Sequence, residues 1–174
     1  QMSVVNSSTI GVNLGNSDGA TALFGLGQTV IGSDGSQWIY VNATSALTTG
    51  TVLAVTTGYS AQPATASNLL GSAALAAGSP GNGEMLAFSQ GVFSAADYGW
   101  VVLRGGNQYV AVSNVSTLGA ALYISINSGY LTTAAASGTM AGIILLTASA
   151  SGVANVIKAY LQYPRLQAGA LLGV

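Results

Sequence analysis

The chain contains no histidine and no cysteine, and only 4% of its 174 residues are charged, against about 25% in ordinary soluble domains. Without cysteine, neither disulfides nor thiolate metal sites can form. Without histidine, the commonest general base and the commonest metal ligand are missing. Three cations are too few for the several phosphates that a duplex-binding protein contacts, so we expect no direct nucleic-acid partner.

Long apolar runs are also missing. The longest mostly apolar stretches, GAALYISI (residues 119–126) and MAGIILLTASA (residues 140–150), are shorter than the roughly 18 residues that a spanning helix needs. No basic residue precedes Arg104, so the positively charged start of a signal peptide is not seen. We therefore expect neither a membrane anchor nor a signal peptide.

The few ionisable side chains do not form a recognisable catalytic set. Asp18 and Asp34 each precede a glycine, where a short carboxylate usually caps its own turn. Glu84 and Asp97 have no neighbours in sequence that would tune their pKa values for paired-carboxylate chemistry. Lys158 alternates within an apparent strand and is expected to be a solvated or interface lysine. These observations predict no enzyme, no metal site and no cofactor.

The surface must be nearly neutral, because Gly, Ala, Ser, Thr and Asn dominate the chain and its net charge is -1. A free monomer with this charge has little repulsion to prevent association, whereas a subunit inside a larger assembly needs none. We therefore expect a structural part that is present in many copies. The alternative is a monomer that Ser, Thr and Asn side chains keep soluble.

Short runs of β-favouring residues recur about every dozen residues, separated by Gly, Asn, Ser and Pro, and no long helical pattern is present. Turn residues between alternating runs predict hairpins at Ser33–Gly35, Gly105–Asn107 and residues 127–129. About ten short strands of this kind predict an all-β fold, either an antiparallel β-barrel or a β-sandwich.

The chain divides into four expected parts: an extended N-terminal arm over residues 1–29, a barrel or sandwich domain over residues 30–166, a loop insertion within it over residues 66–83, and a C-terminal tail over residues 167–174. The segments VLAVTTGYSAQPAT (residues 52–65) and LYISINSGYLTTAA (residues 122–135) echo each other faintly. Either a hairpin was duplicated or biased composition produced the match.

Aromatic and charged residues concentrate in one predicted strand. A period of two places Tyr98, Trp100 and Arg104 on one face, with Asp97 just before it as an ionic partner for Arg104 or for a neighbouring subunit. Amphipathic rings and arginine are enriched at protein interfaces. The other interpretation is that Trp100 fills the core and Arg104 lies at its rim. An earlier strand places Trp38 and Tyr40 together on one face in the same way.

Four blocks of the sequence, GSDGSQWIYVNAT, MLAFSQGVFSAADYGWVVLRG, ALYISINSGYLTT and VIKAYLQYPRL, resemble in the same order a small virion protein of tailed bacteriophages, especially marine and cyanobacterial ones. Residues Tyr98–Gly105 are similar to the family's Tyr-Gly-Trp-Val-x-Leu-Arg-Gly block, and Tyr163–Arg165 to its ending. The resemblance covers roughly residues 25–166. The apolar insertion and the C-terminal extension depart from it.

The resemblance implies a decoration or cement protein on the outside of a phage head, made in the host cytoplasm, with the major capsid protein and copies of itself as partners. Interface candidates are Trp38, Tyr40, Asp97, Tyr98, Trp100, Arg104 and Arg165. Two other functions stay open: a tail-tube, tail-fibre or host-binding subunit, and a carbohydrate-binding adhesion module with Trp38, Tyr40 and Trp100 as stacking platforms.

Overall fold

The computed structural model describes residues 5–6, 9–10, 14–65, 85–113, 117–124, 129–133, 138–149 and 155–168. Every regular element in these ranges is a β-strand, which confirms the all-β prediction. No helix there is long and apolar enough to cross a membrane. The strands are β1 (Val5–Asn6), β2 (Thr9–Ile10), β3 (Ser17–Gly19), β4 (Thr29–Ile31), β5 (Gln37–Ala43), β6 (Val52–Val55), β7 (Ser60–Pro63), β8 (Met85–Phe88), β9 (Tyr98–Val112), β10 (Leu122–Ile124), β11 (Leu131–Thr132), β12 (Gly138–Leu145) and β13 (Asn155–Ala168).

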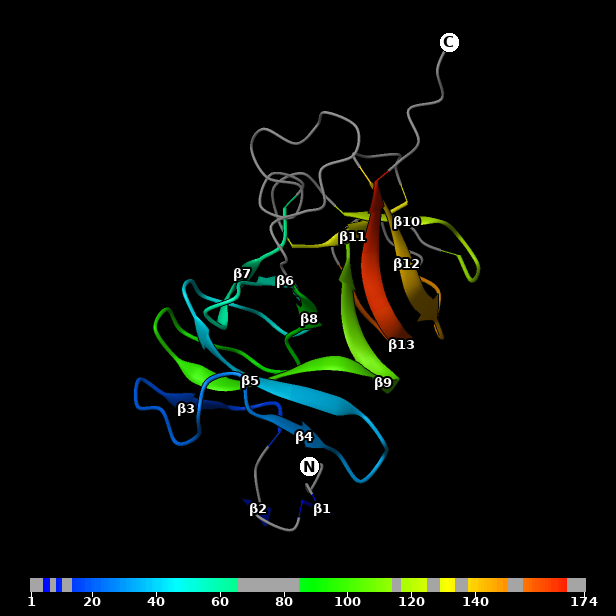
Figure 1. Ribbon diagram of the computed structural model, residues 1–174. Helices are drawn as coiled ribbons and strands as arrows, with labels where there is room; N and C mark the ends of the chain where they lie inside the picture. The colour runs from blue at the N-terminus through cyan, green and yellow to red at the C-terminus, as the bar shows by residue number, and fades with distance from the viewer. Residues whose placement is uncertain are drawn as a thin grey trace.

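Five strands close into a first barrel, in the ring order β5, β9, β8, β6, β7 (Figure 1). The ring closes because β7 pairs in parallel with β5, at Ala61 and Ala43. Small and branched side chains fill this interior, as expected for a narrow barrel. The interior residues are Ile39, Val41, Ala43, Leu47, Leu53, Val55, Ala61, Ala87, Phe93 and Val101.

A second barrel has the ring order β9, β13, β12, β10, β11 and closes where Leu131 of β11 pairs in parallel with Val112 of β9. Its strand connections repeat those of the first barrel. The hydrogen bond beside each closing pair is also repeated, from Thr44 N to Ala61 O at 2.9 Å and from Ser113 N to Leu131 O at 2.8 Å. The two echoing sequence segments therefore supply the same hairpin, β6–β7 and β10–β11, to two barrels of one topology.

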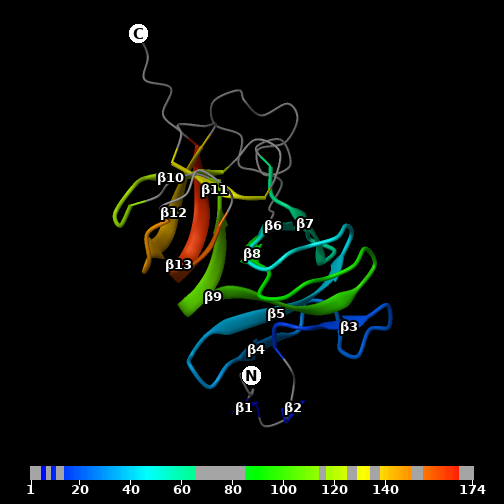
Figure 2. The same ribbon diagram turned by 180° about the vertical axis from the view of Figure 1, so that it is seen from behind.

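The predicted hairpin at Gly105–Asn107 is wrong, because β9 runs without a break from Tyr98 to Val112 and serves both barrels (Figure 2). Gly105 has a φ of +150° and Asn107 a φ of +58°. A Cβ on Gly105 would lie 2.5 Å from the Ser36 Cβ. The glycine signal thus marks a bend with a close approach inside one strand, and not a reversal of the chain.

Residues 14–31 lie across the outside of the first barrel. Leu14 is buried, β3 pairs with β9, and β4 pairs with β5 across the predicted turn at Ser33–Gly35, which the structure confirms. The expected arm is therefore part of the fold from Leu14 onward. The predicted insertion over residues 66–83 lies outside the described residues, as does the tail from residue 169.

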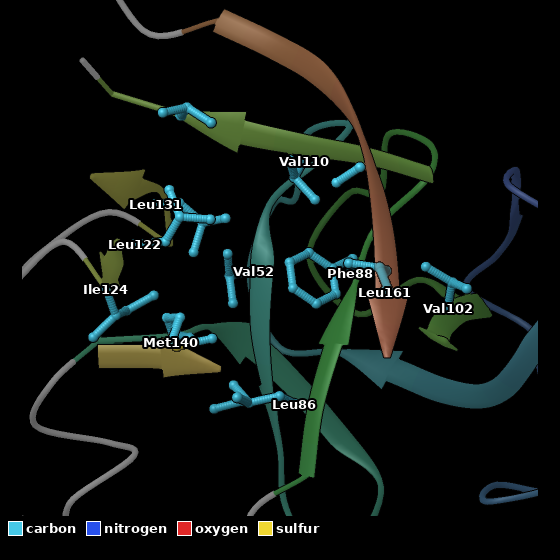
Figure 3. Close-up of a cluster of buried hydrophobic side chains, with 14 of the residues drawn as sticks. Val52, Leu86, Phe88, Val102, Val110, Leu122, Ile124, Leu131, Met140 and Leu161 are labelled. Carbon is cyan, nitrogen blue, oxygen red and sulfur yellow. The ribbon is translucent and has the colours of Figure 1, made fainter. Parts of the chain in front are cut away.

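The two barrels share a core. The residues of β6, β8 and β9 that point out of the first barrel pack against the interior of the second, in one cluster of buried side chains (Figure 3). Val52, Phe88 and Val102 belong to the first barrel's outer surface, while Leu131 and Leu161 belong to the second barrel's interior. This packing holds the barrels together, so the described residues form a single unit.

Candidate functional site

Three of the predicted interface residues are packing residues. Trp38, Tyr40 and Trp100 point out of the first barrel, as the alternation predicted, yet each has 0% of its surface exposed. Phe24 covers two of them, with its ring centroid 5.3 Å from the rings of both Tyr40 and Trp100. The covering residues come from the segment expected to be an arm. Hence these rings are neither an open interface nor stacking platforms for a sugar.

Asp97 and Arg104 do not pair with each other. Asp97 Oδ2 accepts hydrogen bonds from Ser94 N at 2.8 Å and Ser17 Oγ at 3.0 Å, so this carboxylate caps the loop before β9. Arg104 Nε donates to Gln37 Oε1 at 3.1 Å, and the guanidinium carbon lies 4.7 Å from the Tyr163 ring centroid. Tyr98 is half-buried and stacks on Tyr40 with 6.4 Å between ring centroids. Arg165 is exposed on β13.

An exposed apolar surface lies on the outside of the second barrel, over β9, β12 and β13. We call it the open face and define it by Tyr109, Ile144, Leu146, Val156 and Tyr160, which are between 40% and 51% exposed. Ile144 is the register partner of Tyr160 on the neighbouring strand, so the two side chains lie next to each other. This exposed apolar sheet surface is the candidate interaction site.

Lys158 lies in the middle of the open face, opposite Tyr109 in the pairing of β13 with β9. Its Nζ is 3.6 Å from the centroid of the Tyr109 ring and donates to Asn107 O at 3.0 Å. The sequence had marked Lys158 as a solvated or interface lysine, but the apolar residues around it were missed. The alternation of Val156, Lys158 and Tyr160 with buried neighbours could have revealed them.

A pocket of about 450 Å³ borders the open face, and Tyr160 belongs to both. Its lining contains the oppositely charged side chains of Asp34 and Arg104, two exposed tyrosines and the backbone of several glycines. Tyr163 is 63% exposed with a φ of +47°, at the bulge where β13 faces Gly142 of β12. The lining residues are Asp34, Gly35, Arg104, Gly105, Gly106, Tyr160, Leu161, Gln162 and Tyr163.

Catalytic groups are not assembled at either place. No group of three or more His, Cys, Asp or Glu residues that could hold a metal occurs in the part of the chain that the structure describes. Glu84 lies outside that part. Burial raises the pKa of Tyr40 to about 12, so its hydroxyl stays protonated while it donates to Asp18 Oδ2 at 2.8 Å. The open face and the pocket therefore offer binding surfaces.

A comparison of the chain with protein-family models, with curated proteins and with solved structures finds no match.

Proposed function

We propose that this protein is a structural subunit of a tailed-phage virion. In this role it binds the outside of the head and stabilises the capsid by bridging major capsid proteins. Its mechanism is the burial of apolar surface at each copy, multiplied over the many equivalent sites of a shell. It performs no catalytic step.

The open face is the observation that carries this proposal. Tyr109, Tyr160 and the neighbouring aliphatic side chains form an exposed apolar surface on three adjacent strands, suited to burial against another protein. Tyrosine rings bury a large area at low cost in conformational entropy. A subunit whose task is adhesion needs such a surface and little else.

The composition supports the same role. With seven charged residues among 174, the protein has little electrostatic repulsion between copies and few ion pairs that salt could screen. The resemblance of the Tyr98–Gly105 block and of the Tyr163–Arg165 ending to a family of phage virion proteins points in the same direction. The buried Trp100 and the cation–π pair of Arg104 with Tyr163 then act as structural features of that block.

The test uses a matched pair of substitutions on the full chain. Val156 is 47% exposed on the open face, and Val92 is 68% exposed on the loop between β8 and β9. In co-sedimentation with shells assembled from the major capsid protein, Val156→Asp should reduce occupancy at least about tenfold, because a carboxylate would be buried without a partner. Val92→Asp should leave occupancy unchanged. Equal occupancy for both variants, with folding confirmed by circular dichroism, would disprove the role of the open face.

The second candidate is a carbohydrate-binding module, which the pocket beside the open face favours. Tyr160 and Tyr163 offer ring faces for stacking on a sugar, and Asp34 and Arg104 offer hydrogen-bonding groups. Defined binding on a glycan array that Tyr160→Ala abolishes would support this function. A tail-tube, tail-fibre or host-binding subunit would instead be found at the copy number of the tail, and not of the head.

A further inference from the structure

We propose that the open face binds an extended protein segment that carries an aromatic ring and a carboxylate, as residues 18–30 do on the corresponding face of the first barrel. This inference rests on the proposed function only for the identity of the protein that supplies the segment in the virion. The binding chemistry itself follows from a comparison of the two barrels.

The repeated topology gives Tyr109 and Lys158 of the second barrel counterparts on the first. Ala43 and Val112 are the residues at which β5 and β9 close their barrels, and three residues before them lie Tyr40 and Tyr109. The register partner of Tyr40 on the next strand is Trp100, and that of Tyr109 is Lys158. Tyr40 and Tyr109 therefore occupy the same position on the outside of their barrels.

The counterparts differ in what lies over them. Tyr40 has no exposed surface, because Phe24 packs on its ring and its hydroxyl donates to Asp18 Oδ2 at 2.8 Å. Leu23 N also donates to the Tyr40 hydroxyl oxygen, at 3.1 Å. Tyr109, by contrast, is 40% exposed. One face is thus covered by an extended segment of its own chain, whereas the equivalent face is partly exposed among the described residues.

The backbone next to each tyrosine shows how a partner would sit. On the first barrel, Tyr40 N donates to Gln28 O and Gly27 N donates to Tyr40 O, both at 2.9 Å. On the second, the Gln90 side chain makes both bonds, because Tyr109 N donates to its Oε1 at 2.8 Å and its Nε2 donates to Tyr109 O at 3.0 Å. Since this strand edge is already satisfied, the incoming segment packs on the open face through its side chains.

Charge identifies the second group on the segment. All three cations of the chain, Arg104, Lys158 and Arg165, lie on β9 and β13. Asp18 and Asp97 form hydrogen bonds beside the first barrel, and Asp34 lines the pocket next to Tyr160. Lys158 occupies the position that Trp100 has on the first barrel, and in the described part of the chain it contacts the neutral Asn107 carbonyl and the Tyr109 ring. A carboxylate on the incoming segment would complete an ion pair there, partly shielded from water by apolar neighbours.

The covering segment of this chain is itself the probe. A fluorescent peptide with the sequence of residues 14–31 is titrated into the full-length protein at low salt, with fluorescence anisotropy as the readout. We expect saturable binding, and amide shifts on β12 and β13 in nuclear magnetic resonance spectra. Lys158→Glu in the protein, or Phe24→Ala in the peptide, should each weaken binding at least about tenfold. Val92→Asp in the protein, away from the open face, should change nothing.

A charge exchange separates the open face from other sites. A peptide with Asp18→Lys should bind the wild-type protein poorly. It should bind the Lys158→Glu protein with about the affinity that the unmodified peptide has for the wild-type protein. If Lys158→Glu does not weaken binding, the peptide has instead displaced residues 14–31 of the protein from the first barrel. That result would overturn the proposal. Absence of saturable binding would overturn it too. Peptide binding without shell binding would instead disprove the capsid function alone.

Discussion

Gly50 and Gly119 form the same turn in the two barrels, just before β6 and β10. Their φ angles are +83° and +79°, and each turn has a backbone hydrogen bond of 3.2 Å, from Thr51 N to Thr48 O and from Ala120 N to Thr117 O. Their surroundings differ. A Cβ on Gly50 would lie 2.7 Å from Ala111 N, whereas a Cβ on Gly119 would have nothing within 4 Å. The repeat therefore keeps the backbone conformation while the first turn is packed against β9.

This difference predicts unequal costs for one substitution. Gly119→Ala should destabilise the protein by about 1 kcal/mol, the cost of placing a side chain at positive φ. Gly50→Ala should cost at least about 2 kcal/mol more, because the backbone of β9 must also move. Urea denaturation followed by tryptophan fluorescence measures both values. Equal losses of stability would mean that the contact between Gly50 and β9 is not tight in solution.

The Gln90 side chain forms the two hydrogen bonds to the Tyr109 backbone that, at Tyr40, come from the backbone of residues 27 and 28. Gln90→Ala removes both side-chain partners of the solvent-exposed Tyr109 backbone groups and should cost about 1 kcal/mol. Gln28→Ala is the matched control, because Gln28 meets Tyr40 through its backbone oxygen. It should cost less than about 0.5 kcal/mol. Similar losses for the two variants in urea denaturation would argue against this role of Gln90.

The hairpin at Ser33–Gly35 could be predicted from the sequence, because a tight turn is specified by adjacent residues. The bend at Gly105 was misread for a physical reason. A glycine permits positive φ both in a turn and in a bent strand, and which one forms depends on distant partners. Here β5 pairs with the first half of β9 and β13 with the second half, so the two halves lie in different barrels. The residues around Gly105 do not indicate these distant pairings.

The alternation of Tyr98, Trp100 and Arg104 could be predicted from the sequence, but the sequence left open whether Trp100 is exposed or fills the core. Burial of Trp100 depends on Phe24, which lies in a segment without hydrophobic periodicity. The same packing makes a deletion of residues 1–24 informative, although these residues were expected to form an extended arm. That deletion removes the buried Leu14 and the partly buried Phe24 and should lower stability by several kcal/mol, about the cost of truncating these two apolar side chains. Thermal denaturation by circular dichroism measures the loss, and an unchanged midpoint would contradict it.

The two tryptophans are equally buried but differently bonded. Trp38 Nε1 donates to Ser36 Oγ at 2.6 Å, whereas Trp100 Nε1 has no partner in the described part of the chain. Phenylalanine at either position loses ring volume, but only Trp38→Phe also breaks a buried hydrogen bond. Trp38→Phe should therefore be about 1 kcal/mol more destabilising than Trp100→Phe in urea denaturation. The reverse order would show that Trp100 has a partner in solution.

Tyr40 should make stability depend on alkaline pH. Burial raises its pKa in the folded protein to about 12, against 10.0 as its ordinary value. The folded state thus holds the phenolic proton more firmly than the unfolded state does. The stabilisation is complete below pH 10 and is lost as the pH rises toward 12, by up to about 2 to 3 kcal/mol. Tyr40→Phe cannot ionise, so the difference in unfolding free energy between wild type and variant should shrink over that range, as measured by urea denaturation at several pH values. A constant difference would show that the Tyr40 hydroxyl titrates alike in both states.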